Sequence, residues 1–121
     1  MEKHLVSIIT PSYNSGKFIS ETIKSVQNQT YQNWEMIIVD DCSTDKTISI
    51  INEFLDDKRI KLYQLKNNSG TGITRNKALS LSSGRFIAFL DSDDLWKSEK
   101  LEKQLDYLIS ENKPFTFSFY D

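Results

Sequence analysis

The segment EMIIVDD (residues 35–41) places four apolar residues in a row and ends in two aspartates. A continuous apolar run of this kind is typical of a strand that is covered on both faces in a parallel sheet. Two other segments have a similar character. VSIIT (6–10) is a β-branched run that we expect to end at Pro11, and RFIAFL (85–90) is an apolar run followed by acidic residues. These runs predict neighbouring strands of one sheet.

Helical patterns separate the predicted strands. Apolar residues recur at helical spacing over 19–26, 48–55, 73–81 and 101–109, whereas 59–65 alternates as a further strand and 115–120 begins a fifth. Alternating strands and helices form right-handed crossovers that cover both faces of a sheet. The sequence therefore predicts an α/β fold, a three-layer α/β/α sandwich with a mostly parallel sheet. We expect a single domain over residues 1–121 that is incomplete at its C-terminus, because the chain stops just after an apolar strand.

The composition excludes several classes of protein. The chain has 121 residues, of which 38% are hydrophobic and 26% charged, as in an ordinary globular domain. A net charge of −2 provides no basic surface for nucleic acid. No apolar run approaches the ~20 residues of a membrane-spanning helix, and the N-terminus does not resemble a secretory signal. We expect a cytoplasmic location, with the inner face of the membrane as the alternative for the full-length protein.

Polar and charged residues gather where the predicted strands end. The carboxyl ends of parallel strands share one edge of the sheet, where such folds bind ligands. Carboxylates that meet at one edge repel each other unless a cation or hydrogen-bond donors satisfy them. Hard oxygen ligands select Mg²⁺ or Mn²⁺, which combine one or two carboxylates with substrate phosphates. The pattern predicts a metal-bridged ligand that carries phosphate, bound by residues after the strands and by the helix near Arg75, namely Pro11 to Asn14, Asp40, Asp41, Arg75, Asp91, Ser92 and Asp93.

Each of these features taken alone also has an ordinary structural explanation. Aspartates are common after strands because Asp favours turns and helix caps. A lone tyrosine such as Tyr13 is most often a packing residue, and a lone arginine such as Arg75 is usually a solvated charge. The Gly70-Thr71-Gly72 turn lacks both the Walker lysine pattern and the full dinucleotide fingerprint. Their common location at one edge of the sheet is what favours a binding site.

Four segments, in this order and spacing, resemble the family 2 glycosyltransferases. They are VSIITPSYN (6–14), EMIIVDDCSTDKT (35–47), NNSGTGITRNKAL (67–79) and GRFIAFLDSDDLW (84–96). The resemblance covers nearly the whole chain and implies the Rossmann-like GT-A fold. It also implies an inverting transferase that moves a sugar from a nucleotide diphosphate, most often UDP, to an acceptor hydroxyl. Cys42 departs from the pattern, because the family frequently has glycine at that position.

The resemblance assigns roles to residues of the nucleoside end. Pro11 and Tyr13 would line the nucleoside pocket, with the tyrosine ring against the uracil. Asp41 matches the acid that accepts a hydrogen bond from the base. Arg75 matches a basic residue beside the nucleotide.

The segment Asp91-Ser92-Asp93 matches the DXD motif of the same family. The resemblance implies that Asp91 approaches the ribose or the donor sugar, with Ser92 in the same nucleotide-sugar site. It implies that Asp93 coordinates Mn²⁺ or Mg²⁺. An inverting transfer also needs a general base, which the family supplies from a later segment, beyond Asp121. We therefore expect this chain to bind nucleotide and metal but to turn over slowly or not at all.

Other interpretations remain open from the sequence. A nucleotidyltransferase on a related scaffold would carry a glycine-rich, basic loop after the first strand, but TPSYNSGK (10–17) has one glycine and one lysine. A non-catalytic receiver-like module would carry its acidic pair after the first strand, not after the second and fourth. A nucleotide-binding module without activity would keep the same motifs. The sugar is undetermined, and the acceptor could be a saccharide, a lipid-linked sugar, a protein or a wall polymer.

Overall fold

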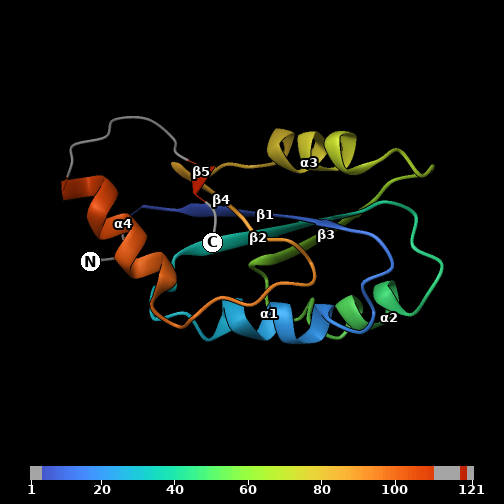
Figure 1. Ribbon diagram of the computed structural model, residues 1–121, viewed down its shortest axis with the longest axis horizontal. Coiled ribbons are helices and arrows are strands. Elements are labelled where there is room, and N and C mark those ends of the chain that lie inside the picture. Colours follow the sequence, from blue (N-terminus) through green and yellow to red (C-terminus); the bar gives the residue numbers. More distant parts are fainter. Residues whose placement is uncertain (1–3, 111–117, 120–121) are drawn as a thin grey trace.

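The computed structural model describes residues 4–110 and 118–119, and its strands and helices alternate along the chain (Figure 1). The strands are β1 (Val6–Ser12), β2 (Trp34–Asp40), β3 (Ile60–Gln64), β4 (Phe86–Phe89) and β5 (Ser118–Phe119). The helices are α1 (Ile19–Gln27), α2 (Thr47–Asn52), α3 (Thr71–Ser80) and α4 (Lys100–Ser110). The predicted fifth strand is present at 118–119, and the rest of that prediction lies outside the described residues.

The strands form one sheet in the order β3-β2-β1-β4-β5, and the pairings between these strands are all parallel. The chain first builds the sheet outward from β1 through β2 to β3, and then returns to the other side of β1 with β4. The crevice at such a reversal, outside the carboxyl ends of the strands, is where open α/β sheets bind ligands. The fold thus places a potential site between the ends of β1 and β4.

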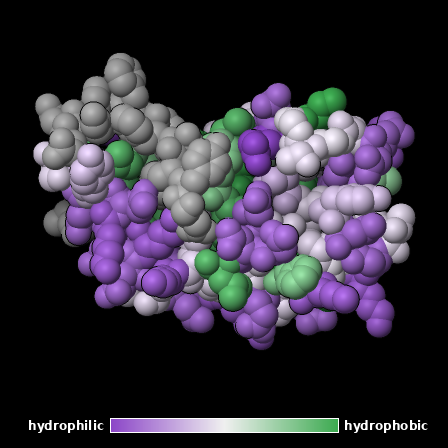
Figure 2. Space-filling model, in the orientation of Figure 1, coloured by the Kyte–Doolittle hydropathy of each residue, from purple (hydrophilic) through white to green (hydrophobic). Residues whose placement is uncertain are grey.

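Two separate apolar cores confirm the predicted three-layer arrangement. Alternate residues of β1 and β2 point to opposite faces of the sheet. One face packs against α1, α2 and α4 through a core that includes Ile8, Ile23 and Met36, whereas the other packs against α3 through Ile9 and Ala78. Figure 1 shows α1 and α2 on one side of the sheet and α3 on the other. The outer surface in this orientation is mostly hydrophilic, with hydrophobic side chains in small groups (Figure 2).

The first strand is longer than the sequence predicts, because it continues through Pro11 to Ser12. The Val6 amide donates to Asn33 O on the β2 side, and successive residues of a strand face alternate neighbours. The nitrogen of Pro11 therefore faces the β4 side. The pairing of β1 with β4 ends at Ile9, so no hydrogen bond is lost at the proline. Proline is tolerated at such an unpaired position.

Glu35 forms a buried polar cluster at the opposite edge of the sheet. Its carboxylate accepts hydrogen bonds from Ser7 Oγ (2.6 Å), Lys61 Nζ (2.9 Å) and the Ser83 amide (2.8 Å). The Gly84 amide donates to Ser7 Oγ, and a Cβ on Gly84 would lie only 2.6 Å from that oxygen. Burial raises the pKa of Glu35, but the hydrogen bonds from Ser7, Ser83 and Lys61 outweigh it and leave the pKa below 4.5. The ionised carboxylate thus joins β1, β2, β3 and the turn before β4.

We expect Glu35→Gln to lower the free energy of unfolding at pH 7 by about 1–3 kcal/mol, because the amide cannot replace the charged acceptor. A carboxyl group whose pKa is lower in the folded state stabilises the protein above its unfolded pKa, and this contribution is lost as the pH falls through the folded pKa. The difference between the two proteins should therefore shrink below about pH 4.5. Denaturant unfolding between pH 3 and 8 measures it. Glu53→Gln, at an exposed position, is the control, and an equal loss in both variants would contradict the prediction.

Candidate functional site

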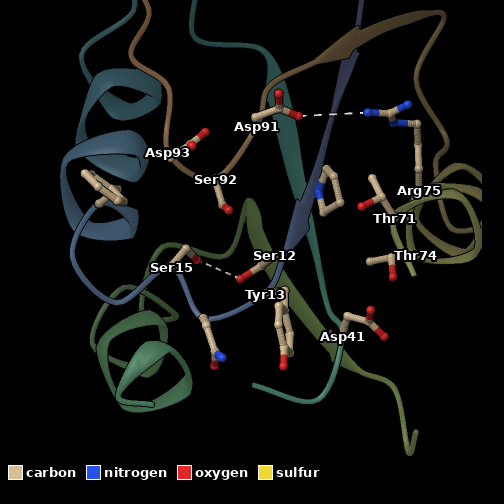
Figure 3. Close-up of a pocket in the computed structure, with 13 residues that line it drawn as sticks. Ser12, Tyr13, Ser15, Asp41, Thr71, Thr74, Arg75, Asp91, Ser92 and Asp93 are labelled. Atoms are coloured by element: carbon tan, nitrogen blue, oxygen red, sulfur yellow. Dashed lines mark hydrogen bonds and ion pairs between the residues drawn. The ribbon is translucent and has the colours of Figure 1, made fainter. Parts of the chain in front are cut away.

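A pocket of about 380 Å³ lies at the carboxyl edge of the sheet, where β1, β2 and β4 end (Figure 3). The structure brings to this pocket the seven residues to which the family resemblance assigns a role: Pro11, Tyr13, Asp41, Arg75, Asp91, Ser92 and Asp93. Of the other residues expected at this edge, Ser12 and Asn14 also line the pocket, whereas Asp40 does not. Four loops or helix ends that are far apart in sequence supply them. Their placement together agrees with a common site, and their individual roles remain predictions.

Several lining residues were not among the nominated ones. Thr71 and Thr74 line the pocket from the first turn of α3, beside Arg75. Thr71 precedes Thr74 by three residues and Arg75 by four, which is a helical spacing, and this periodicity is a signal that could have identified the two threonines. Ser15 and Phe18 also line the pocket, but their positions before α1 carry no comparable pattern. The chain path between β1 and α1 alone decides that they face the pocket.

Asp41 lies at one end of the pocket with Tyr13 (Figure 3). Tyr13 is 52% exposed, so its ring presents an open aromatic surface, whereas Asp41 is only 5% exposed. The Asp41 carboxylate accepts hydrogen bonds from the amides of Ser69 (2.6 Å) and Gly70 (2.9 Å). Gly70 adopts a φ of +94°, a region that favours glycine. Asp41 therefore holds the turn before α3 in place, a structural role that the sequence did not predict for it.

Arg75 and Asp91 lie at the other end of the pocket and form an ion pair with a distance of 3.9 Å between Nη2 and Oδ1. The Arg75 guanidinium also lies 5.3 Å from the centre of the Phe89 ring. Its Nε atom is buried and has no hydrogen-bond partner within the described part of the chain. The guanidinium thus retains an unused donor beside residues 91–94, which follow β4 and are called the acidic loop below.

The Asp93 side chain is exposed and, among residues 4–110, no hydrogen bond or ion pair engages its carboxylate. The described residues also contain no group of three or more His, Cys, Asp or Glu side chains that could hold a metal ion by themselves. A cation at Asp93 would therefore take most of its ligands from a bound molecule or water. This donor set fits Mg²⁺ or Mn²⁺ with substrate phosphates, because these ions need few protein carboxylates.

The loop after β1 is fastened to the loop after β2. Asn14 Oδ1 accepts a hydrogen bond from the Thr44 amide (2.8 Å), and the Asn14 amide donates to Ser43 Oγ (2.8 Å). Asp45 accepts a hydrogen bond from the Gly16 amide (3.1 Å). Cys42, in the same loop, is exposed and has a φ of +67°. A positive φ explains why glycine suits this position better than cysteine.

We expect Asp41→Asn to lower the free energy of unfolding by about 1–3 kcal/mol, because the amide oxygen can replace only one acceptor and leaves a buried N–H group unsatisfied. Hydrogen exchange of the 68–72 amides should become faster in this variant. Asp56→Asn removes the same charge at an exposed position and serves as the control. An Asp41→Asn protein as stable as the control would show that these two bonds are unimportant.

We expect Cys42→Gly to raise the free energy of unfolding by up to about 1 kcal/mol. Relief of the left-handed conformation is worth roughly 1–2 kcal/mol, and the added flexibility of glycine in the unfolded chain offsets about 0.5–1 kcal/mol of it. Cys42→Ala removes the thiol but keeps the Cβ, and should give no such gain. Denaturant unfolding of the two variants separates the effects, and equal stabilities would refute the backbone explanation.

Curated relatives match almost the whole chain. The putative teichuronic acid biosynthesis glycosyltransferase TuaG of Bacillus subtilis is 51% identical over 119 residues, which are 98% of this chain and 47% of TuaG. An Escherichia coli protein named UDP-Glc:alpha-D-GlcNAc-diphosphoundecaprenol beta-1,3-glucosyltransferase WfgD is 48% identical over 121 residues, which are 100% of this chain and 47% of WfgD. The chain thus spans about half the length of these relatives.

Solved structures share the fold. S. aureus TarS 1–349 in complex with UDP-GlcNAc matches with a TM-score of 0.84 and 37% identity, over 88% of this chain and 32% of that one. The mannosyltransferase PcManGT from Pyrobaculum calidifontis, in complex with GDP-Man and Mn²⁺, matches with a TM-score of 0.80 and 27% identity, over 85% of this chain and 32% of that one. Both structures are complexes with a nucleotide sugar, and their similarity confirms the predicted GT-A type of fold.

The sequence model of one protein family matches the part of the chain that forms the site. The family described as Glycosyl transferase family 2 matches residues 7–119, a range that includes the ends of β1, β2 and β4 and all seven nominated residues. With the architecture, the pocket and the relatives in agreement, the chain belongs to glycosyl transferase family 2.

Proposed function

We propose that this chain forms the donor site of a glycosyltransferase that binds a UDP-linked sugar with a divalent metal ion and transfers the sugar with inversion. The observation that carries the proposal is the composition of the pocket. It combines an exposed aromatic ring at one end with an arginine and two aspartates at the other. A nucleoside diphosphate has the same two parts, a flat base and an anionic diphosphate.

The nucleoside end is proposed to hold uracil against Tyr13 and Pro11. Both carboxylate oxygens of Asp41 already accept backbone hydrogen bonds, but each oxygen can accept a second one. A hydrogen bond from the N–H group of uracil is therefore compatible with the structural role of Asp41. The TarS structure, whose description names UDP-GlcNAc, supports a UDP-linked donor.

The diphosphate end is proposed to rely on Arg75, Asp91 and Asp93. The free carboxylate of Asp93 would hold Mn²⁺ or Mg²⁺, and such an ion offsets the negative charge that develops on the departing diphosphate. Arg75 has a buried Nε without a partner in the described region, and its guanidinium can donate to a phosphate oxygen. Asp91, held near Arg75 at 3.9 Å, would face the ribose or the donor sugar.

The acceptor is proposed to be a saccharide, with a lipid-linked sugar as the best supported kind. The WfgD name specifies a diphosphoundecaprenol acceptor, and the TuaG name specifies teichuronic acid biosynthesis. Both names suggest assembly of a surface polysaccharide. Among residues 4–110, no helix is long and apolar enough to cross a membrane. For a lipid-linked acceptor, we propose that the full-length protein works at the inner face of the membrane.

The donor site is tested by calorimetric titration of UDP, GDP and dTDP into the chain, with Mn²⁺ and with a chelator. We expect UDP to bind most tightly, and its Kd to rise at least about tenfold in the chelator, because the diphosphate then meets uncompensated carboxylates. Asp93→Asn should bind UDP in Mn²⁺ as weakly as the unaltered chain binds it in the chelator. Asp106→Asn, at an exposed position of α4, controls for the loss of charge.

The outcomes separate the parts of the proposal. Tighter binding of GDP or dTDP would overturn the UDP assignment. Binding that is equal with Mn²⁺ and with the chelator would overturn the metal assignment. A response of Asp93→Asn no larger than that of Asp106→Asn would remove Asp93 from the metal site.

A further inference from the structure

A row of polar side chains from helix α1 and the residues just after it contacts the segment that follows β4. Thr22 and Ser25 are three residues apart and lie on one side of the helix, and Gln29 lies just beyond the end of the helix at Gln27. Gln29 Nε2 donates to Lys97 O (2.7 Å), and Gln29 Oε1 accepts from the Leu101 amide (3.1 Å). Ser25 Oγ accepts a hydrogen bond from the Trp96 amide (3.3 Å). The row follows the segment from the acidic loop to the start of α4.

Thr22 contacts the acidic loop itself. Its Oγ1 lies 2.7 Å from Asp94 O and 3.0 Å from Ser92 O, the carbonyl groups on either side of Asp93. The same hydroxyl lies 3.2 Å from Phe18 O, one turn earlier in its own helix. A hydroxyl has one proton to donate, and the shortest of the three distances favours Asp94. Thr22 is therefore placed to hold the backbone that flanks Asp93.

The burial of Thr22 strengthens this interpretation. Its side chain is fully buried, and a buried carbonyl or hydroxyl group without a hydrogen bond is costly. Valine has nearly the same shape and would fill the same space, so packing alone does not require a hydroxyl at this position. The Asp93 side chain, in contrast, has no partner within residues 4–110. The backbone around Asp93 is anchored while its carboxylate stays free to bind.

We propose that Thr22 is a positioning residue for Asp93, an inference that rests on the proposed function for its effect on metal. The hydroxyl of Thr22 donates to the carbonyl group of Asp94, next to Asp93, and thereby sets the direction in which the Asp93 carboxylate points. Thr22 does not line the pocket. Its effect is on the geometry of the acidic loop.

The test compares Thr22→Val, which keeps the shape and loses the hydroxyl, with Thr22→Ser, which keeps the hydroxyl. Hydrogen exchange of the 91–97 amides should become about tenfold faster in Thr22→Val, as expected for the loss of one buried hydrogen bond. The UDP Kd measured with Mn²⁺ should also rise about tenfold, whereas the UDP Kd measured with a chelator should not change. Thr22→Ser should restore both quantities to near the values of the unaltered chain.

Ser7→Ala is the control for a loss of stability. Ser7 is fully buried and its hydroxyl bonds to Glu35 and Gly84 at the opposite edge of the sheet. This variant should lower the free energy of unfolding without changing the ratio of the UDP Kd values with and without Mn²⁺. An effect on that ratio as large as that of Thr22→Val would attribute both results to stability and overturn the proposal.

The remaining outcomes are also decisive. Unchanged exchange of the 91–97 amides in Thr22→Val would overturn the role of the hydroxyl, whatever the chain binds. Faster exchange with an unchanged UDP Kd in Mn²⁺ would make Thr22 a structural residue only. If the unaltered chain does not bind UDP, the proposed function and the effect on metal both fail, and the exchange data still decide whether Thr22 holds the loop.

Discussion

The central strand β1 pairs over unequal lengths with its two neighbours, and the site depends on this inequality. On one side β1 pairs with β2 from Val6 to Ser12, whereas on the other its pairing with β4 ends at Ile9. The carboxyl edge of the sheet therefore has a step between β1 and β4. The end of β1 extends past the ladder on that side, and the chain that leaves β4 carries Asp91 across it. Pro11 and Asp91 to Asp93 line the pocket at this step.

Two aspartates of the pocket, Asp41 and Asp93, have opposite environments. Asp41 is buried and its charge is satisfied by two backbone amides of the turn before α3. Asp93 is exposed, and in the described region its carboxylate has no partner. A satisfied carboxylate holds a loop, and an unsatisfied one is available to a ligand. The same residue type thus does structural work in one loop and is left free in another, because the surrounding backbone differs.

A buried polar cluster that joins the strands lies away from the pocket. Glu35, Ser7 and the turn at Gly84 join the strands at the edge opposite the site. The carboxyl edge is held instead by contacts between loops and by the polar row that begins on α1. At this edge Asp41 is satisfied by backbone amides and Asp91 is paired with Arg75, and only Asp93 among the pocket carboxylates has no partner within the described residues.

Much of this arrangement could be predicted from the sequence. The apolar runs at 6–10, 35–40 and 85–90 have the continuous character that parallel strands need when helices cover both faces, and the helical periods fall between them. The acidic residues follow the strands directly, so their meeting at one edge is a consequence of parallel topology. Six of the seven residues that the resemblance nominates lie at or just after a strand end and line the pocket for this reason, whereas Arg75 reaches it from α3. Local sequence patterns were enough to predict where each strand ends, and parallel strands bring these ends to the same edge of the sheet.

Other features needed the tertiary structure. The sequence predicted that the first strand ends at Pro11. The strand continues through Pro11 without losing a hydrogen bond, because β1 is no longer paired with β4 at that position. Glu35 and Thr22 sit in ordinary strand and helix patterns, and their partners are 28 and 72 residues away. Hydrogen bonds across such separations depend on how the layers pack, which local periodicity does not encode. Apolar runs, helical periods and the acids after the strands are local features, so the elements, their order and the edge that carries the acids follow from the sequence alone. The packing of α1 and α3 against the sheet decided which aspartate is held and which is left free.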